Sequence, residues 1–366
     1  MKALCTVVFA GFTAALTGCS TAPTQVALPI TDAAKNRLVL ANQMQSHGWM
    51  LPSAKSMNLL YVSNNGDPGR LLVFSYPMGE LVGEVAVPSE YQVGLCSDAA
   101  GNVFVPTAGS VSQSYIYEYA HGGTQPIATL SDPGYANGCA LDPVSGNLAV
   151  TNYLSTGGSQ TSYGDVAIFP HAEGTPSTYF DPEISFYNYC AYDGSGNLYV
   201  DGYDTYASMS TIGELPSGSG IFSNITLTKS IRPFSMQWVG SSLLVSSLTD
   251  VQSKHGPQPI YGIRVSGNSG VVTGPVLLHS PRNLNPYQPV QFWLLGHTLI
   301  GPDRVRGGNG LVNFWHYPAG GWPKKIIHRP GHASGFFGVT MSKTGRHFPR
   351  AIHRQEGQPP QSPVSP

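Results

Sequence analysis

The feature that most constrains the fold of this chain is a segment that recurs every 45 to 50 residues. Its three strongest copies read VGLCSDAAGNVFVPT (93–107), NGCALDPVSGNLAVTN (137–152) and NYCAYDGSGNLYVDG (188–202). Each copy has an apolar run, an Asp, a Gly-Asn pair and a second, alternating run. Because Gly and Asn tolerate positive φ, each copy is expected to form two strands joined by a tight turn.

Weaker copies at 50–64, 235–247 and 290–302 bring the number of complete repeats to six. After each copy comes a third apolar run, such as GRLLVFSYP or SYIYEYAHG, and often a fourth, such as LVGEVAVP or PIATLSDP. Four short strands per repeat of this length are typical of a β-propeller blade, and one blade cannot bury both of its faces alone. We therefore predict an all-β chain with six four-stranded blades, and seven blades stay open as an alternative.

Both ends of the repeat region are expected to take part in closing the ring. The run GFFGVTMSKTG (335–345) matches a first, inner strand but has no further strands after it. The simplest arrangement pairs it with the N-terminal strands in one shared blade. The 43 glycines and 30 prolines separate apolar runs and are interpreted as turns. The propeller domain is accordingly placed at residues 47–345.

The N-terminus, MKALCTVVFAGFTAALTGCS, carries a targeting signal. Its apolar run from Ala3 to Gly18 is short for a membrane span and suits the core of a signal peptide, predicted here at residues 1–18. The ending Leu16-Thr17-Gly18-Cys19 resembles the lipobox of bacterial lipoproteins. That resemblance implies that Cys19 receives diacylglycerol and palmitate and begins the mature chain. An ordinary cleaved signal and an uncleaved anchor are the alternatives.

Several acyl chains on one residue give stable anchoring. We thus expect an exported lipoprotein, held by Cys19 at the periplasmic or outer-membrane face of a bacterial envelope, with residues 19–46 as a tether. The net charge of −1 gives no reason to expect a nucleic-acid partner. Residues 346–366 are expected to be a disordered basic, Pro-rich tail, which either meets an anionic envelope surface or is an ordinary solvated terminus.

Removal of Cys5 with the signal and acylation of Cys19 would leave three cysteines, Cys96, Cys139 and Cys190. An odd number in an oxidising compartment permits at most one disulfide. All three stand in apolar contexts and are interpreted as core residues. The stretch 193–204 also has oxygen-bearing side chains at the spacing of a calcium loop. It lacks the Gly required at the sixth position, where Leu198 stands, so we interpret it as a turn.

The repeats resemble those of NHL proteins and of the six-bladed gluconolactonase/senescence-marker family. Asn137 and the residues after it are similar to a segment whose Asn binds the metal of those lactonases, and Asn188 stands where they have a catalytic Asp. Their third ligand, a Glu, corresponds to the stretch Ser46-His47-Gly48-Trp49. The resemblance implies lactone hydrolysis with a divalent cation such as calcium or zinc. Two neutral amides bind such an ion weakly, however, and without a carboxylate the general base is missing.

Aromatic residues precede nearly every expected inner strand, and polar residues are expected in the turns after the second strands. The aromatic set is Tyr91, Tyr135, Phe186, Tyr187, Phe234, Tyr287 and Phe336, with Trp49 near the first strand; the polar set is Asn64, Thr107, Asn152, Asp201, Ser247 and Asp303. Both sets are expected on one face of the ring. Such a mouth suits a neutral glycan or peptide, and packing between blades is the alternative use of the aromatics.

Three functions stay open. The leading prediction is a lipid-anchored, monomeric binding or scaffold module without a cofactor, whose mouth takes a glycan, a peptide or an envelope protein. The residues predicted to contact it are Tyr91, Tyr135, Asn137, Asn152, Tyr187, Asn188, Asp201, Tyr287 and Asp303. The second is a divergent metal-dependent lactone hydrolase that uses Asn137 and Asn188. The third is a purely structural envelope protein. The sequence therefore favours a non-enzyme without deciding the question.

Overall fold

The structure is a computed structural model that describes residues 48–65, 69–89, 91–110, 112–155, 163–204, 209–248, 257–281, 291–303, 310–328 and 335–344. These residues all belong to the compact unit Gln43–Pro366, which is described by itself. The predicted signal peptide, Cys19, the tether, Tyr287 and the tail lie outside the described residues. No helix within the described ranges is long and apolar enough to cross a membrane.

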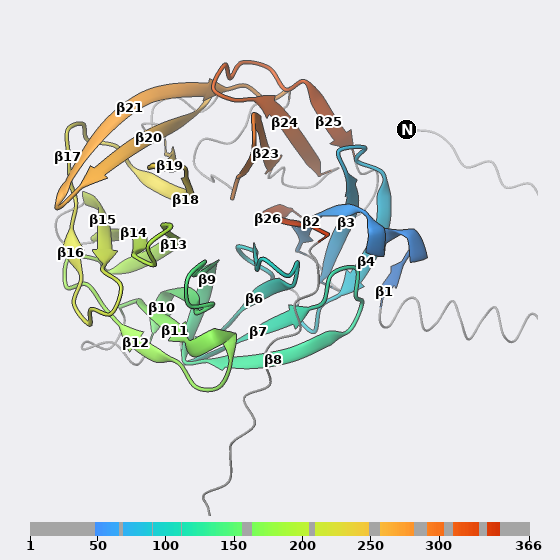
Figure 1. Ribbon diagram of the computed structural model, residues 1–366, viewed down its shortest axis with the longest axis horizontal. Helices are drawn as coiled ribbons and strands as arrows, with labels where there is room; N and C mark the ends of the chain where they lie inside the picture. Colours follow the sequence, from blue (N-terminus) through green and yellow to red (C-terminus); the bar gives the residue numbers. More distant parts are fainter. Residues whose placement is uncertain are drawn as a thin grey trace, which may run out of the picture. The chain divides into compact units, whose positions relative to one another are not determined.

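Six antiparallel sheets form the blades of a propeller, as the repeats predict (Figure 1). Blade A runs from the inside outward as β26 (Phe336–Ser342), β2 (Asn58–Asn64), β3 (Arg70–Tyr76), β4 (Leu81–Ala86) and β1 (Gly48–Met50). Blade B is β5 (Cys96–Ser97), β6 (Val103–Ser110), β7 (Gln113–Tyr119) and β8 (Pro126–Asp132). Blade C is β9 (Gly134–Leu141), β10 (Leu148–Ser155), β11 (Asp165–Phe169) and β12 (Ser177–Tyr179).

The other three blades continue the same order. Blade D is β13 (Phe186–Tyr192), β14 (Leu198–Asp204), β15 (Met209–Leu215) and β16 (Ser223–Asn224). Blade E is β18 (Pro233–Val239), β19 (Ser242–Ser247), β20 (Gln258–Ser266) and β21 (Ser269–Leu278), with β17 (Thr226–Leu227) added in parallel outside β21. Blade F is β22 (Trp293–Leu295), β23 (Thr298–Asp303), β24 (Leu311–His316) and β25 (Lys325–His328). Two short 3-10 helices, η1 (Pro52–Ser56) and η2 (Pro170–Ala172), lie between strands.

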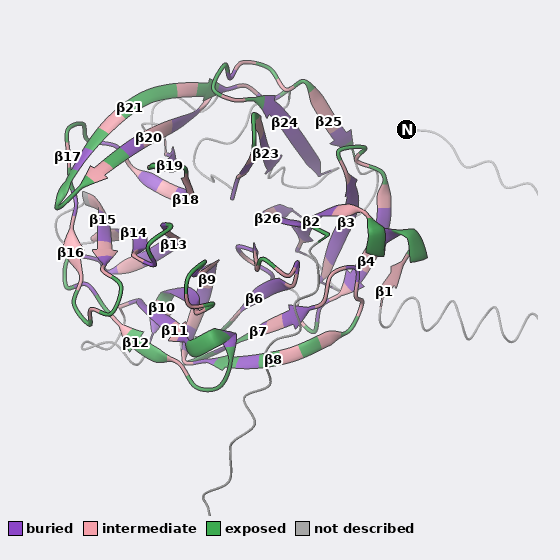
Figure 2. Ribbon diagram, in the orientation of Figure 1, coloured by how far each residue is buried: buried purple, intermediate pink, exposed green. Residues whose placement is uncertain are grey.

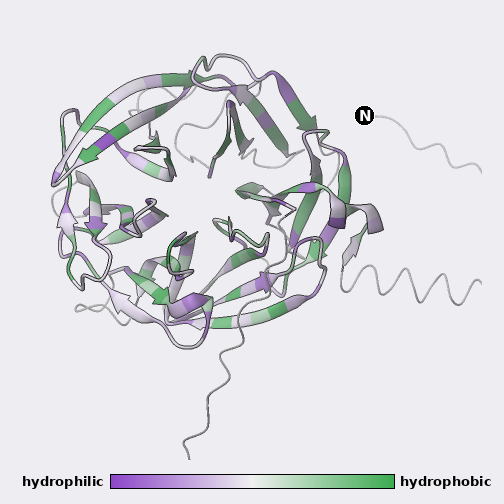
Figure 3. Cartoon of the chain, viewed as in Figure 1, coloured by the Kyte–Doolittle hydropathy of each residue, from purple (hydrophilic) through white to green (hydrophobic). Residues whose placement is uncertain are grey.

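Among the described residues the core consists of six buried clusters, one at each interface between neighbouring blades. The cluster between blades A and B, for example, joins Leu59 and Tyr61 to Val103 and Tyr119. A middle strand therefore buries both faces, which is why β2 reads NLLYVSN and is buried from Leu59 to Ser63. Outer strands face solvent on one side. Figure 2 accordingly shows exposed residues along β21 and buried ones along β3 and β24, while Figure 3 shows that β21 also carries hydrophobic residues.

The ring closes as predicted, by pairing the last strand with the first long one. β26 runs antiparallel to β2, with Val339 opposite Val62, and becomes the inner strand of blade A. This closure corrects one detail of the sequence interpretation. The stretch near Trp49 is not next to an inner strand, because β1 pairs with β4 at the outer edge of the blade and Trp49 lies opposite Glu84. Gly48 and Trp49, the described part of the stretch compared with the lactonase Glu, are thus at the periphery of the ring.

Candidate functional site

The inner strands of blades C and D bring Asn137 and Asn188 together, the two residues singled out by the lactonase resemblance. The side-chain Nδ2 of Asn137, on β9, donates to the backbone oxygen of Asn188, on β13, at 3.0 Å. Thr151 Oγ1, on β10, donates to the same oxygen at 2.8 Å. The neighbouring inner strands are therefore connected through side chains at this point. Asn137 itself is half-buried, so part of its amide stays accessible.

Asp201 lies behind Asn188 in the second strand of blade D. Its carboxylate accepts the backbone N–H of Tyr189 at 2.8 Å and the side-chain Nδ2 of Asn188 at 3.3 Å. Burial raises the pKa of Asp201 well above its ordinary value, and these hydrogen bonds oppose the rise only in part. Asp201 therefore orients the Asn188 amide from within the blade. Asn188 is 9% exposed and its amide is held inside the blade, so the Oδ1 of the half-buried Asn137 is the acceptor left for a hydroxyl or N–H group.

This arrangement does not fit a catalytic divalent cation. The nearby oxygens belong to neutral amides, and the Asp201 carboxylate is directed at Tyr189 and Asn188. A hard cation requires several oxygen ligands, some of them charged, at one point. Among the described residues, no group of three or more His, Cys, Asp or Glu side chains is gathered for a metal. We derive no hydrolytic step from these residues.

The predicted aromatic set divides into exposed and packing residues. Tyr91, 59% exposed, is open to solvent. Tyr135, Phe186 and Phe234 are half-buried. Tyr187 and Phe336 are fully buried, and the Tyr187 hydroxyl bonds the backbone N–H of Asp181. Tyr187 is therefore a packing residue between blades and reaches no ligand directly.

The predicted polar set lies within the second strands, not in the turns after them. Asn152, Asp201, Thr107 and Ser247 are buried in β10, β14, β6 and β19 because both faces of these strands are covered by neighbouring blades. Asn152 and Asp201 thus support the mouth from inside and do not line it. Asp303 ends β23, and its side chain lies outside the described part of the chain.

One residue of the mouth was missed by the sequence interpretation. Tyr153 directly follows Asn152 on β10 and is 39% exposed. Its ring stacks on Phe186 of the next blade, with ring centroids 4.7 Å apart. A β-bulge between Asn152 and Leu154 disturbs the alternation here, so the pattern of the strand did not reveal which way the ring points. Tyr153 and Phe186 thus form a stacked aromatic pair, and Phe186 begins the strand that carries Asn188.

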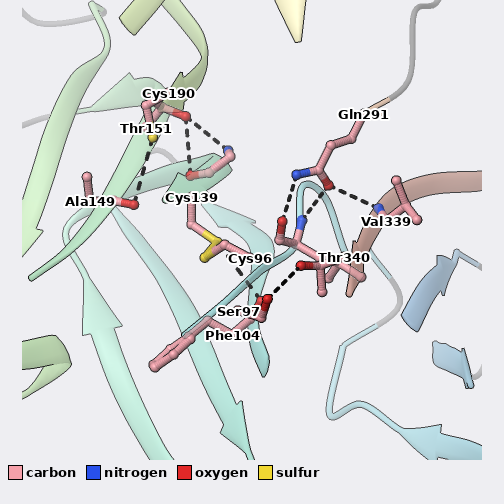
Figure 4. The surroundings of a disulfide bond; sticks show 12 residues. Cys96, Ser97, Phe104, Cys139, Ala149, Thr151, Cys190, Gln291, Val339 and Thr340 are labelled. Atoms are coloured by element: carbon pink, nitrogen blue, oxygen red, sulfur yellow. Dashed lines mark hydrogen bonds between the residues drawn. A yellow bond between two sulfur atoms is a disulfide. The ribbon is translucent and has the colours of Figure 1, made fainter. Parts of the chain in front are cut away.

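The structure agrees with the prediction that the three cysteines are core residues and that the calcium-like stretch is a turn. Cys96 and Cys139 form one disulfide between the inner strands of blades B and C, and Cys190 is a buried free thiol (Figure 4). Asp193 accepts hydrogen bonds from the backbone N–H groups of Ser195 and Asn197 and from the Asn197 side chain. This confirms a turn. Asp201 does not join Asp193, since its carboxylate bonds within β13.

Comparison with known proteins shows the fold and no family. No protein-family model matches the chain, and no curated protein matches it either. The chain is similar to a structure from a nidogen/laminin complex, with 15% identity over 79% of this chain and 99% of that one and a TM-score of 0.56. It is also similar to TolB from Acinetobacter baumannii, with 13% identity over 86% of this chain and 74% of that one and a TM-score of 0.55. These likenesses establish a six-bladed β-propeller.

Proposed function

We propose that this protein is an exported, lipid-anchored β-propeller that binds a neutral envelope ligand, a glycan or a peptide segment, at one face of the ring. The observation that supports export besides the lipobox-like segment is the Cys96–Cys139 disulfide. Disulfides persist in oxidising compartments and are rare in the cytosol. Cys19 is the residue through which the anchor would be attached.

The proposed ligand site is the mouth formed by blades B, C and D. It offers the exposed ring of Tyr91, the stacked pair Tyr153 and Phe186, and the amide oxygen of the half-buried Asn137, whose side chain is held by the backbone of Asn188. Aromatic faces with a few fixed acceptors suit a neutral ligand that has both an apolar side and N–H or O–H donors. A propeller of similar fold was solved in a complex between nidogen and laminin, which is a precedent for a binding role.

Labelling with palmitate tests the anchor. We expect label on the wild-type protein expressed in a bacterium and none on Cys19→Ala, because the thiol is the acylated group. Cys5→Ala is the matched control and should keep the label, since Cys5 precedes the expected cleavage point. Equal labelling of Cys19→Ala, or no label on the wild type, would contradict the anchor.

A binding screen tests the mouth. Immobilised envelope polysaccharides and peptidoglycan fragments are probed with the wild type, Tyr91→Ala and Tyr153→Ala. We expect saturable binding that weakens by roughly tenfold per lost aromatic contact, which corresponds to about 1.4 kcal/mol. Tyr115→Ala removes an exposed tyrosine from blade B outside this set and is the control. Binding that all three variants retain would place the ligand elsewhere.

The divergent lactone hydrolase is the second candidate, because Asn137 and Asn188 do lie side by side. A bound cation would raise the melting temperature by mass action. Melting is therefore measured with and without millimolar calcium, zinc and manganese, for the wild type, Asn137→Ala and Asn188→Ala. We expect no shift. A shift that both substitutions abolish would favour the hydrolase and call for a screen of lactones.

A further inference from the structure

A pocket of about 240 Å³ lies between blades C and D. It is lined by the β9–β10 turn, by β12, and by the connection after β15. The turn stands at the opposite end of β9 from Tyr135, so the pocket opens away from the proposed mouth. Its lining includes Asp142, Asn147, Tyr179, Tyr192, Leu215 and Ser217.

The turn of blade C differs from its counterparts by one residue. Asp142–Asn147 spans six residues, whereas Asp98–Asn102 and Asp193–Asn197 span five. In the shorter turns the carboxylate accepts both the backbone N–H and the side-chain Nδ2 of the Asn, as Asp98 does at 2.7 and 2.9 Å. The extra residue in blade C gives the Asp142 carboxylate different hydrogen-bond partners.

Asp142 bonds within the first half of its turn. Its Oδ1 accepts the backbone N–H of Val144 at 2.9 Å, and its Oδ2 accepts the hydroxyl of Ser145. Asn147 Oδ1 accepts the backbone N–H of His171 at 3.0 Å, just as Asn197 Oδ1 accepts that of Ser217 at 2.9 Å in blade D, so the difference between the turns lies in the partners of the Asp carboxylate. The Asp142 carboxylate is thereby separated from the turn Asn and borders the pocket. A carboxylate has about four acceptor positions, so two remain for a ligand.

Asp142 is only 6% exposed, and a glycine of blade D leaves the space beside its carboxylate free. Gly196 has φ +83° and lies against Asp142, where an added Cβ would be 3.3 Å from each carboxylate oxygen and 3.2 Å from Ser217 Oγ. A larger residue would crowd the space between Asp142 and Ser217 and would also strain the backbone. The absent side chain thus keeps the carboxylate and the serine at one opening.

The lining selects the chemistry of a ligand. No Lys, Arg or His is among the residues that border the pocket, and Asp142 supplies a negative charge, so an anionic ligand would be repelled. Hydroxyl groups come from Tyr179, Tyr192 and Ser217. Burial, followed by the nearby Cys190 and Asp142, raises the pKa of Tyr192, which keeps its phenol protonated as a donor. Apolar side chains complete the wall, namely Ile168, Leu198 and Leu215.

We propose that this pocket binds a neutral, polyhydroxylated ring of the size of one sugar residue. Its hydroxyls would donate to the Asp142 carboxylate and accept from the Tyr192 phenol, and its apolar side would lie on Leu198 and Leu215. The volume is below the usual range for drug-sized ligands, which limits the occupant to a single ring. This second site is independent of the mouth.

The test titrates four probes into the purified full-length protein and follows saturation-transfer NMR. The probes are methyl α-glucopyranoside, N-acetylglucosamine, choline as a cation and inorganic phosphate as an anion. The variants are Asp142→Asn and Tyr192→Phe. Asp98→Asn is the matched control, because it alters the equivalent turn carboxylate of blade B. Tyr91→Ala alters only the mouth, so it separates the two sites.

We expect at least one pyranoside to bind with a Kd on the order of 1 mM. Binding should weaken roughly tenfold in Asp142→Asn and Tyr192→Phe, through loss of one hydrogen bond each. Asp98→Asn and Tyr91→Ala should bind like the wild type. Should Asp142→Asn fold poorly, Tyr192→Phe decides. Saturable binding of choline or phosphate in place of the pyranosides, or pyranoside binding unchanged in Tyr192→Phe, would overturn the proposal.

Discussion

Asp132 and Asp165 are two buried carboxylates that share one side-chain amide. The Nδ2 of Asn152 donates to Asp132 Oδ1 at 3.2 Å and to Asp165 Oδ1 at 2.7 Å. Within the described residues, Asp132 Oδ2 and Asp165 Oδ2 have no hydrogen-bond partner. Burial raises the pKa of Asp132 to about 7; the bond from Asn152 opposes this shift and the charge of Asp165 adds to it. The folded chain therefore holds a proton here that the unfolded chain releases.

This shift predicts how stability depends on pH. The pKa of Asp132 rises from an ordinary 3.8 to about 7 on folding. The contribution of Asp132 to the free energy of unfolding is thus complete below pH ~4 and is lost as the pH rises to about 7, by up to about 1.4 kcal/mol per pH unit. Asp132→Asn removes this titration. We expect it to melt above the wild type at pH 8, by about 2–4 °C per kcal/mol, and to have a flatter pH profile.

Thermal melts between pH 4 and 8 check this prediction. Glu183→Gln neutralises an exposed carboxylate and should follow the wild-type curve. An Asp132→Asn curve that runs parallel to the wild type over this range would show that Asp132 does not titrate there.

At the scale of strands, the repeat explains why one cysteine stays free. The disulfide joins Cys96, two residues before its turn Asp98, to Cys139, three residues before Asp142. Cys190 likewise stands three residues before Asp193, but the position two before Asp142 is Ala140. Cys190 Sγ contacts the Ala149 carbonyl at 3.9 Å much as Cys139 Sγ contacts that of Phe104 at 4.0 Å. Cys190 thus corresponds to Cys139, but the residue that corresponds to Cys96 is Ala140, so Cys190 has no cysteine to pair with.

Ala140→Cys should therefore create a second disulfide, to Cys190. Ala140 and Cys190 already pack in one cluster. We expect a stabilisation of about 2–4 kcal/mol, because the bond would constrain the unfolded chain. Peptide mapping without reductant identifies the bond, and thermal melts with and without reductant measure its effect.

Ala191→Cys is the matched control for this bond. Residue 191 is the corresponding position of blade D and packs in the cluster towards blade E, so its thiol has no cysteine to meet. A free Cys190 thiol in oxidised Ala140→Cys would show that residues 140 and 190 do not face each other as Cys96 and Cys139 do.

At the scale of the whole propeller, closure depends on one buried glutamine besides β26. Gln291, just before β22, accepts the N–H groups of Leu95 at 2.8 Å and Val339 at 3.0 Å through Oε1. Its Nε2 donates to the oxygen of Leu95 at 2.6 Å. One side chain thereby connects blades F, A and B at the point where the ring closes (Figure 4). Gln237 connects only blades E and F, through Leu294, and is half-buried.

Gln291→Leu should destabilise the ring strongly. It leaves three buried backbone groups unpaired, each at a cost of about 1–3 kcal/mol. We expect a loss of about 3 kcal/mol or more in urea unfolding. Gln237→Leu should lose less, because it leaves two backbone groups unpaired, both of Leu294, and Gln237 is itself half-buried. Equal losses in the two variants would argue against a special role for the closing point.

The repeat, the four strands of each blade and the closing run at 335–345 could be predicted from the sequence because they depend on local patterns. Alternation, turn residues and a fixed period are all visible within about 50 residues. The Asp193 turn was predictable for the same reason, since its hydrogen bonds span four residues. One boundary was misjudged at Trp49, where the pattern identifies a strand but not which edge of which sheet it joins.

Only the tertiary structure decided the contacts between residues that are far apart in the chain. The pairing of Cys96 with Cys139, the bridge from Gln291 to Leu95 and the shared amide of Asn152 all depend on how neighbouring blades face each other. The periodic pattern is the same for a residue that lines the mouth and for one that packs behind it. Tyr91 is exposed whereas Tyr187 is buried, so only Tyr91 can contact a ligand. Asn152 and Asp201 are also buried, because each second strand is covered on both sides by the neighbouring blades.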